Sequence, residues 1–141
     1  MPNVGVKKDL NTGLSTSYSG IAMEDAAVLI NDQEIHNNNI PLGKSFTIVN
    51  KNVSGLAEKD GKLFVGCSLL ITDEKGNKIL DEADLFKDKE GILKEEGKFL
   101  YCKVNTGEPM QTGKTYNVLV RFWDKSGPGK IENNLAILMV D

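Results

Sequence analysis

The sequence predicts an all-β protein, an antiparallel β-sandwich of about seven strands. Apolar and polar residues alternate in several short segments, and a spacing of two is typical of a strand that buries one face. Residues that favour turns, such as Gly, Pro, Asn and Asp, separate these segments. The chain has 141 residues, which is enough for one domain whose hydrophobic core needs no metal or disulfide to fold.

The strand expected over residues 114–124 shows this alternation most clearly. Its even-numbered residues from Tyr116 to Phe122 are apolar and fall on one side. The odd-numbered residues of the strand fall on the other side. We therefore expect the first side to face the core, and Trp123 and Arg121 to point outward.

Six further strands are expected along the chain. They cover residues 26–30, 44–49, 63–72, 78–80, 99–104 and 135–140. A tight turn after the third of these predicts that it forms a hairpin with the fourth. Residues 81–98 lack the strand alternation and contain Gly91 and Gly97, so we predict a long connection that crosses from one sheet to the other.

The N-terminal part differs in composition from the rest. Residues 1–20 are rich in Ser, Thr and Gly, and we expect a polar lead-in or tether with one edge strand near residues 14–18, followed by the sandwich domain over residues 21–141. No apolar run approaches the roughly 18–20 residues of a membrane span, and the N-terminus lacks the apolar core of a signal peptide. Taken literally, this indicates a cytoplasmic protein. The tether-like composition instead favours an exported protein, periplasmic or on the cell surface, whose signal was removed ahead of residue 1.

The charge distribution argues against nucleic acid as a partner. The formal net charge is −3, and Arg121 is the only arginine among 17 basic residues. A protein that neutralises a phosphate backbone needs clustered Lys and Arg, whereas the lysines here are scattered along the chain.

Residues 112–124, which begin Thr-Gly-Lys-Thr-Tyr-Asn-Val, resemble the penultimate strand of immunoglobulin-like and fibronectin-type domains. The resemblance implies an immunoglobulin-like sandwich in which the Tyr116 hydroxyl caps a corner. Antibody domains have a Cys two residues later, but this chain has Val118, so their inter-sheet disulfide is not implied. The chain is also similar in pattern to small exported or lipid-anchored sandwich proteins of bacteria, which implies export and a lipid anchor on the precursor, but no chemistry.

Few residues could carry out catalysis or bind a metal. His36 is the only histidine, it lies in a polar loop, and no G-x-S-x-G motif is present. We expect no catalytic residues, no metal site and no cofactor. A small hydrolase is the third alternative for function, and it would require His36 beside a nucleophile, or an ordered carboxylate pair, in a concave pocket.

Cys67 and Cys102 both lie on expected strands. Free thiols in these positions would behave as small core hydrophobes, and this is the interpretation that we favour. Alternatively, a disulfide between them would stabilise the fold by about 3–4 kcal/mol, and export would permit it.

The acidic stretch 81–96 provides the second alternative for function, a calcium-dependent binding domain. Calcium prefers six to eight oxygen ligands. The spacing of the carboxylates, however, does not fit an EF-hand loop, which favours a solvated acidic loop.

Trp123, Arg121 and Tyr101 are the candidate ligand-binding residues. An outward-facing aromatic ring beside Arg121 could stack on a sugar or anchor a protein. Alternatively, the lead-in or the long crossover covers Trp123. The leading interpretation is a non-catalytic interaction or accessory module of an exported bacterial protein, with a protein or glycan as its partner.

Overall fold

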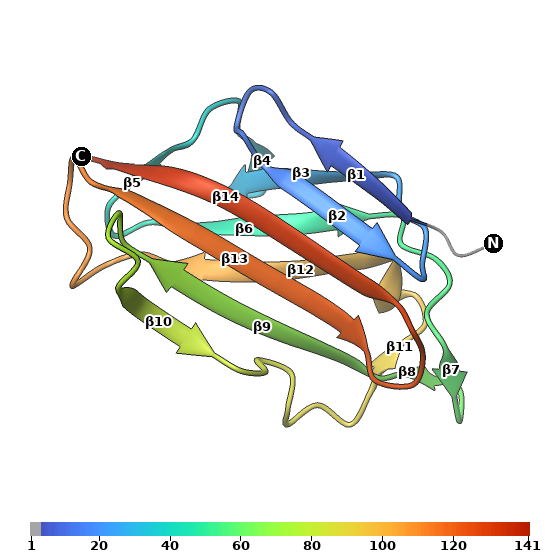
Figure 1. Ribbon diagram of the computed structural model, residues 1–141. Coiled ribbons are helices and arrows are strands. Elements are labelled where there is room, and N and C mark those ends of the chain that lie inside the picture. Colours follow the sequence, from blue (N-terminus) through green and yellow to red (C-terminus); the bar gives the residue numbers. More distant parts are fainter. Residues whose placement is uncertain (1–3) are drawn as a thin grey trace.

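The computed structural model describes residues 4–141, which form two β-sheets packed face to face (Figure 1). The large sheet contains, in spatial order, β1 (Val4–Lys8), β2 (Ser15–Ser19), β14 (Lys130–Val140), β13 (Thr115–Asp124), β9 (Val65–Thr72) and β10 (Lys78–Glu82), and β5 (Asn39–Pro41) pairs with the far part of β14. The small sheet contains β12 (Phe99–Asn105), β6 (Ser45–Lys51), β3 (Asp25–Ile30) and β4 (Gln33–Glu34). The two-residue strands β7 (Glu58–Lys59), β8 (Lys62–Leu63) and β11 (Ile92–Leu93) form a third sheet, and a 3-10 turn (Glu96–Lys98) precedes β12.

The two packed, largely antiparallel sheets confirm the predicted all-β sandwich, and the order of their central strands resembles that of an immunoglobulin-like domain. Strands β3, β6 and β12 occupy the places of strands A, B and E in one sheet, and β9, β13 and β14 occupy those of C, F and G in the other. All of these pairs are antiparallel. The connection between β10 and β12 crosses from the large to the small sheet, as expected for residues 81–98.

Strand β13 lies in the middle of the large sheet and shows the predicted division into two faces. Tyr116, Val118, Val120 and Phe122 are buried in the core, while Arg121 is exposed and Trp123 is half-buried on the outer face. The Tyr116 hydroxyl accepts a hydrogen bond from the backbone N–H of Gln111 at 2.8 Å. This is the corner geometry that the immunoglobulin resemblance implied.

A buried polar network crosses the core between the sheets. The side-chain amides of Asn50 on β6 and Asn133 on β14 exchange two hydrogen bonds of 3.0 and 2.9 Å, and both residues are fully buried. The Asn133 amide also donates to the Thr16 hydroxyl on β2 at 2.9 Å, and the Asn50 amide donates to the backbone carbonyl of Leu100 at 3.3 Å. The network therefore joins β2 and β14 of the large sheet to β6 and β12 of the small sheet.

Residues 4–20 form the hairpin β1–β2 rather than a loosely ordered lead-in. The strand expected near residues 14–18 is present as β2, but it is not an edge strand, because it pairs with β1 on one side and with the first half of β14 on the other. Leu14 and Thr16 are each 1% exposed, so this segment contributes to the core despite its polar composition. The remainder of the predicted tether, residues 1–3, lies outside the described residues.

The last strand is also longer than predicted, since β14 begins at Lys130 rather than at residue 135. Ile131 and Asn133 continue the inward-facing side of the strand. A polar residue at the second of these positions interrupts the apolar alternation, which explains why the pattern did not reveal the first half of the strand.

Replacing Asn133 by Ala should destabilise the protein strongly. The Asn50 amide and the Thr16 hydroxyl would lose a buried partner, and we expect the free energy of unfolding to fall by about 2–4 kcal/mol. Equilibrium urea denaturation measures this change. Asn134→Ala, at the exposed neighbouring position, is the matched control and should change stability by less than about 0.5 kcal/mol. A similar small effect of Asn133→Ala would contradict the role of the network.

Tyr116→Phe tests the corner hydrogen bond. The variant keeps the ring in the core but leaves the N–H of Gln111 without its partner, so we expect a loss of about 1–2 kcal/mol by the same measurement. Tyr101→Phe removes a hydroxyl from an exposed ring and serves as the control. If the two variants had the same free energy of unfolding, the hydrogen bond of the Tyr116 hydroxyl would contribute nothing to stability.

Candidate functional site

The outer face of the large sheet carries a shallow hollow of about 510 Å³. We call it the Trp123 trough. The outward-facing residues that line it are Val4, Val6, Ser17, Ser19, Arg121, Trp123, Lys130 and Glu132. Figure 1 views the sandwich from the side of this sheet, with β14 and β13 in front of β6 and β12.

The register of the strands places these side chains in two parallel rows across the sheet. One row contains Val4, Ser19, Lys130, Trp123 and Gly66, which lie directly opposite one another on β1, β2, β14, β13 and β9. The next row contains Val6, Ser17, Glu132, Arg121 and Ser68. The ring is therefore flanked by Gly66 on one side and by the longer side chains of Lys130, Arg121 and Glu132, and the small residues of β1 and β2 line the far end of the trough.

The indole of Trp123 lies over Gly66 on the outer face of the sheet. A Cβ atom at Gly66 would collide with the indole atoms Cε2, Cζ2 and Nε1. The absence of a side chain at Gly66 therefore provides the space that the indole occupies.

Charged groups lie beside the ring. The Arg121 guanidinium pairs with the Glu132 carboxylate at 3.3 Å, and both side chains remain about half exposed, at 57% and 44%. A single contact through Nε leaves the terminal nitrogens of the guanidinium as free donors in this geometry. The trough thus combines an aromatic surface with hydrogen-bond donors and acceptors.

Tyr101 does not join Trp123 and Arg121. It lies on β12, an edge strand of the small sheet, and points outward on the opposite side of the sandwich with 58% of its surface exposed. A second hollow, of about 580 Å³, lies beside it on that face. The structure therefore brings together two of the three candidate residues.

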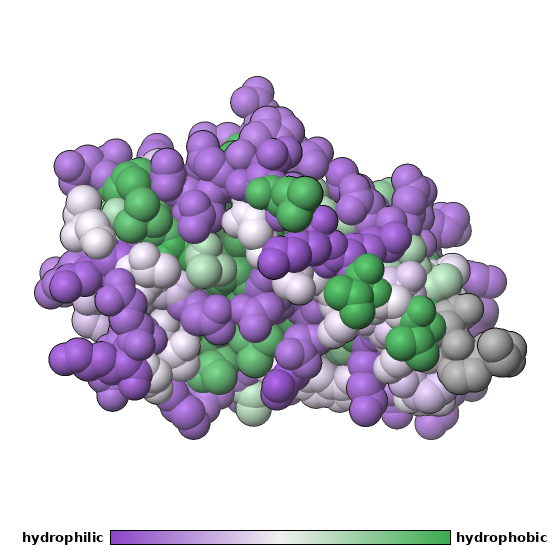
Figure 2. Space-filling model, turned by 45° about the horizontal axis from the view of Figure 1, so that its top comes forward, coloured by the Kyte–Doolittle hydropathy of each residue, from purple (hydrophilic) through white to green (hydrophobic). Residues whose placement is uncertain are grey.

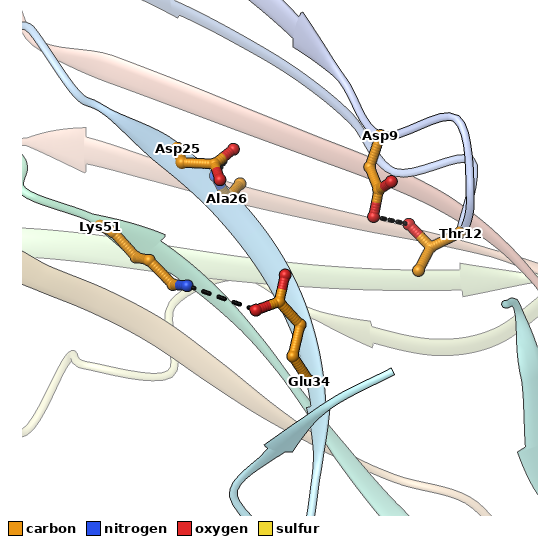
Figure 3. A network of polar contacts seen from close by, with 6 residues as sticks. All are labelled: Asp9, Thr12, Asp25, Ala26, Glu34 and Lys51. Atoms are coloured by element: carbon orange, nitrogen blue, oxygen red, sulfur yellow. Dashed lines mark hydrogen bonds and ion pairs between the residues drawn. The ribbon is translucent and has the colours of Figure 1, made fainter. Parts of the chain in front are cut away.

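A third hollow, of about 410 Å³, separates the β1–β2 hairpin from β3 and β4, and His36 lines it from an exposed loop. The nearby carboxylates serve local structure (Figure 3). Asp9 accepts a hydrogen bond from the Thr12 hydroxyl at 2.9 Å, and Glu34 pairs with Lys51 at 3.7 Å. Within residues 4–141, no three His, Cys, Asp or Glu side chains are grouped so that they could hold a metal ion.

The acidic stretch 81–96 is anchored by Asp84 rather than gathered around a cation site. The Asp84 carboxylate accepts hydrogen bonds from the backbone N–H groups of Cys67 and Phe86 at 3.0 and 2.9 Å, and pairs with the Lys125 ammonium at 2.7 Å. Burial alone would raise the pKa of Asp84, but the Lys125 ammonium and the two N–H groups outweigh it, so the pKa of this carboxyl lies below its usual value.

Cys67 and Cys102 are both buried with free thiols, on β9 and β12 respectively. This agrees with the interpretation that we favoured from the sequence. They lie on the inner faces of the two sheets and so take no part in either outer hollow.

Sequence reasoning missed Gly66, whose lack of a side chain leaves space for the indole of Trp123. A signal for it existed, because a glycine inside an apolar strand often marks a close approach of another group. The serines and Glu132 carried no such signal, since their position beside Trp123 depends on which strands pair.

Comparisons with known proteins identify the fold but no family. No protein-family profile matches the chain, and no curated protein matches it. A similar solved structure is the C-terminal domain of Wzt, with a TM-score of 0.58 and 11% sequence identity, over 99% of this chain and 78% of that chain. At this identity the likeness shows the β-sandwich fold alone. In the part of the chain that the structure describes, no helix is long and apolar enough to span a membrane.

Asp84→Asn tests the anchoring of the acidic loop through its pH dependence. Because the folded-state pKa of Asp84 is depressed, its contribution to stability is present above the ordinary carboxyl pKa of 3.8 and is lost as the pH falls through the lower folded-state value. We expect the variant to be less stable than the wild type by about 1–2 kcal/mol at neutral pH. The difference should shrink below about pH 4, because the wild type then loses the same contribution.

Urea denaturation between about pH 7 and pH 2.5 measures both effects. Asp88→Asn, at an exposed position in the same loop, is the control. A stability difference for Asp84→Asn that stays constant with pH would contradict the assignment.

Proposed function

We propose that this protein is a non-catalytic binding module that recognises a glycan at the Trp123 trough. The observation that carries the proposal is the Trp123 indole, which lies over Gly66 and lines a hollow on the outer face of the large sheet. A sugar ring presents apolar C–H groups on one face, and these pack on the face of an aromatic ring. The Gly66 backbone holds the indole in place before binding, so little side-chain entropy would be lost.

The groups around the ring suit the polar edge of a sugar. Ser17 and Ser19 provide hydroxyls, Arg121 provides donors, and Glu132 provides an acceptor, all on the same outward face. The trough is shallow and crosses four strands, which favours a segment of a polysaccharide over a small ligand enclosed on all sides.

The same lining supports a binding role rather than hydrolysis. Most glycoside hydrolases need two carboxyl groups on either side of the scissile bond. Among the described residues that line the trough, Glu132 is the only one with a carboxylate, and it is paired with Arg121.

A protein is the second candidate partner. Val4 and Val6 on the edge strand β1 are 69% and 73% exposed, and they lie at the end of the trough. An edge strand with exposed apolar side chains can pair with an extended segment of another protein. Figure 2 shows the surface on this side of the molecule, where apolar residues are scattered among mostly hydrophilic ones.

The proposal includes export of the chain to the periplasm or the cell surface, with a lipid anchor on the precursor. The similarity in sequence pattern to small exported or lipid-anchored sandwich proteins of bacteria supports it. Cell-surface polysaccharides would then be accessible to the trough.

Trp123→Ala should abolish glycan binding. We expect the wild type to bind one or more members of a panel of neutral and uronate-containing polysaccharides, and the variant to bind at least tenfold more weakly, because a central Trp often contributes about 2 kcal/mol or more. Isothermal titration calorimetry measures the affinity, and the thermal midpoint of each variant shows whether it is folded.

Tyr101→Ala is the matched control, since it removes an exposed aromatic ring from the opposite face. It should bind like the wild type. Binding that depends on Tyr101 but not on Trp123 would place the site on the small sheet. No binding to any member of the panel would contradict the glycan proposal and leave the protein partner as the remaining candidate.

A further inference from the structure

Cys67 and Cys102 occupy facing positions in the core. Cys67 points inward from β9 of the large sheet and is 0% exposed, while Cys102 points inward from β12 of the small sheet and is 3% exposed. Each is an isolated cysteine on its own sheet. Neither cysteine takes part in the proposed binding face, because both side chains point into the core.

The geometry of the two strands brings the thiols together. Strands β9 and β12 run in the same direction (Figure 1). Val65 on β9 and Leu100 on β12 line the same small space between the sheets, and each cysteine follows two residues later on its strand. The neighbouring Cys102 thiol and burial both raise the pKa of Cys67, in agreement with this placement.

We infer that Cys67 and Cys102 are oxidised to an inter-sheet disulfide when the chain folds in the presence of a disulfide donor. The donor is glutathione disulfide or the active-site disulfide of a thiol oxidoreductase. One cysteine thiolate attacks the donor and forms a mixed disulfide, releasing the first donor thiolate. The second cysteine thiolate then displaces the remaining donor sulfur, so the protein loses two protons and two electrons and the donor is reduced to two thiols.

The disulfide would form during folding, before the two sheets have packed together. Both thiols are buried once the sheets have packed, and buried thiols are unreactive. The bridge would join the C and E strands of the sandwich, whereas the antibody bridge joins strands B and F. It would also enclose residues 68–101, which include the whole crossover between the sheets.

Oxidative refolding tests this inference. The reduced, denatured protein is refolded in a glutathione redox buffer, and in parallel in dithiothreitol. We expect a monomer whose mass is lower by two hydrogens in the redox buffer, with no thiol available to an alkylating reagent after denaturation. Its thermal midpoint should exceed that of the reduced protein by about 10 °C, because the bridge restricts the unfolded chain.

Cys102→Ala is the control, and its midpoint should be the same in both buffers. Should this variant not fold, the wild type kept in dithiothreitol provides the same comparison. A wild-type monomer that retains two alkylatable thiols after refolding in the redox buffer would overturn the inference. Bridges that form only between two chains would overturn it as well. Neither result depends on glycan binding, so failure of the disulfide proposal would not contradict the glycan proposal, and failure of the glycan proposal would not contradict this one.

Discussion

The reciprocal pair of side-chain amides, Asn50 and Asn133, is the contact on which the arrangement of the two sheets depends. Apolar contacts are not directional, but two buried amides that exchange hydrogen bonds are satisfied in one alignment only. Any other alignment would leave buried donors and acceptors without partners. The Thr16 hydroxyl extends this constraint to the N-terminal hairpin.

The binding face follows from this alignment. Successive residues of a strand point to opposite faces, so an inward Asn133 requires Glu132 to point outward. The strand register then places Glu132 opposite Arg121, and Lys130 opposite Trp123. A buried polar contact on one side of the sheet therefore determines which side chains surround the aromatic ring on the other side.

A second set of contacts, made by Asp84, holds the crossover between the two sheets in place. Asp84 ties the crossover to β9 through the N–H of Cys67, and to the turn after β13 through Lys125. Cys67, whose backbone N–H donates a hydrogen bond to Asp84, points inward from β9 at this position. The C-terminal domain of Wzt has a similar β-sandwich fold at 11% sequence identity. Because a fold alone does not determine function, the function proposed here is argued from the side chains of this chain.

The sequence alone determined the class of fold, most of the strands, and the inward and outward sides of β13, because a period of two is a local property that neighbouring residues define. It also identified Tyr116, whose partner Gln111 lies only five residues away. The pairing of the strand near residues 14–18 with β14, and the first half of β14 itself, could not be predicted, because their core positions include Thr16 and Asn133, which are satisfied only by residues far away in the chain. Only the tertiary structure decided that Tyr101 lies on the opposite face from Trp123, that Gly66 supports the indole, and that the two cysteines meet, since each of these depends on which distant strands pair or face one another.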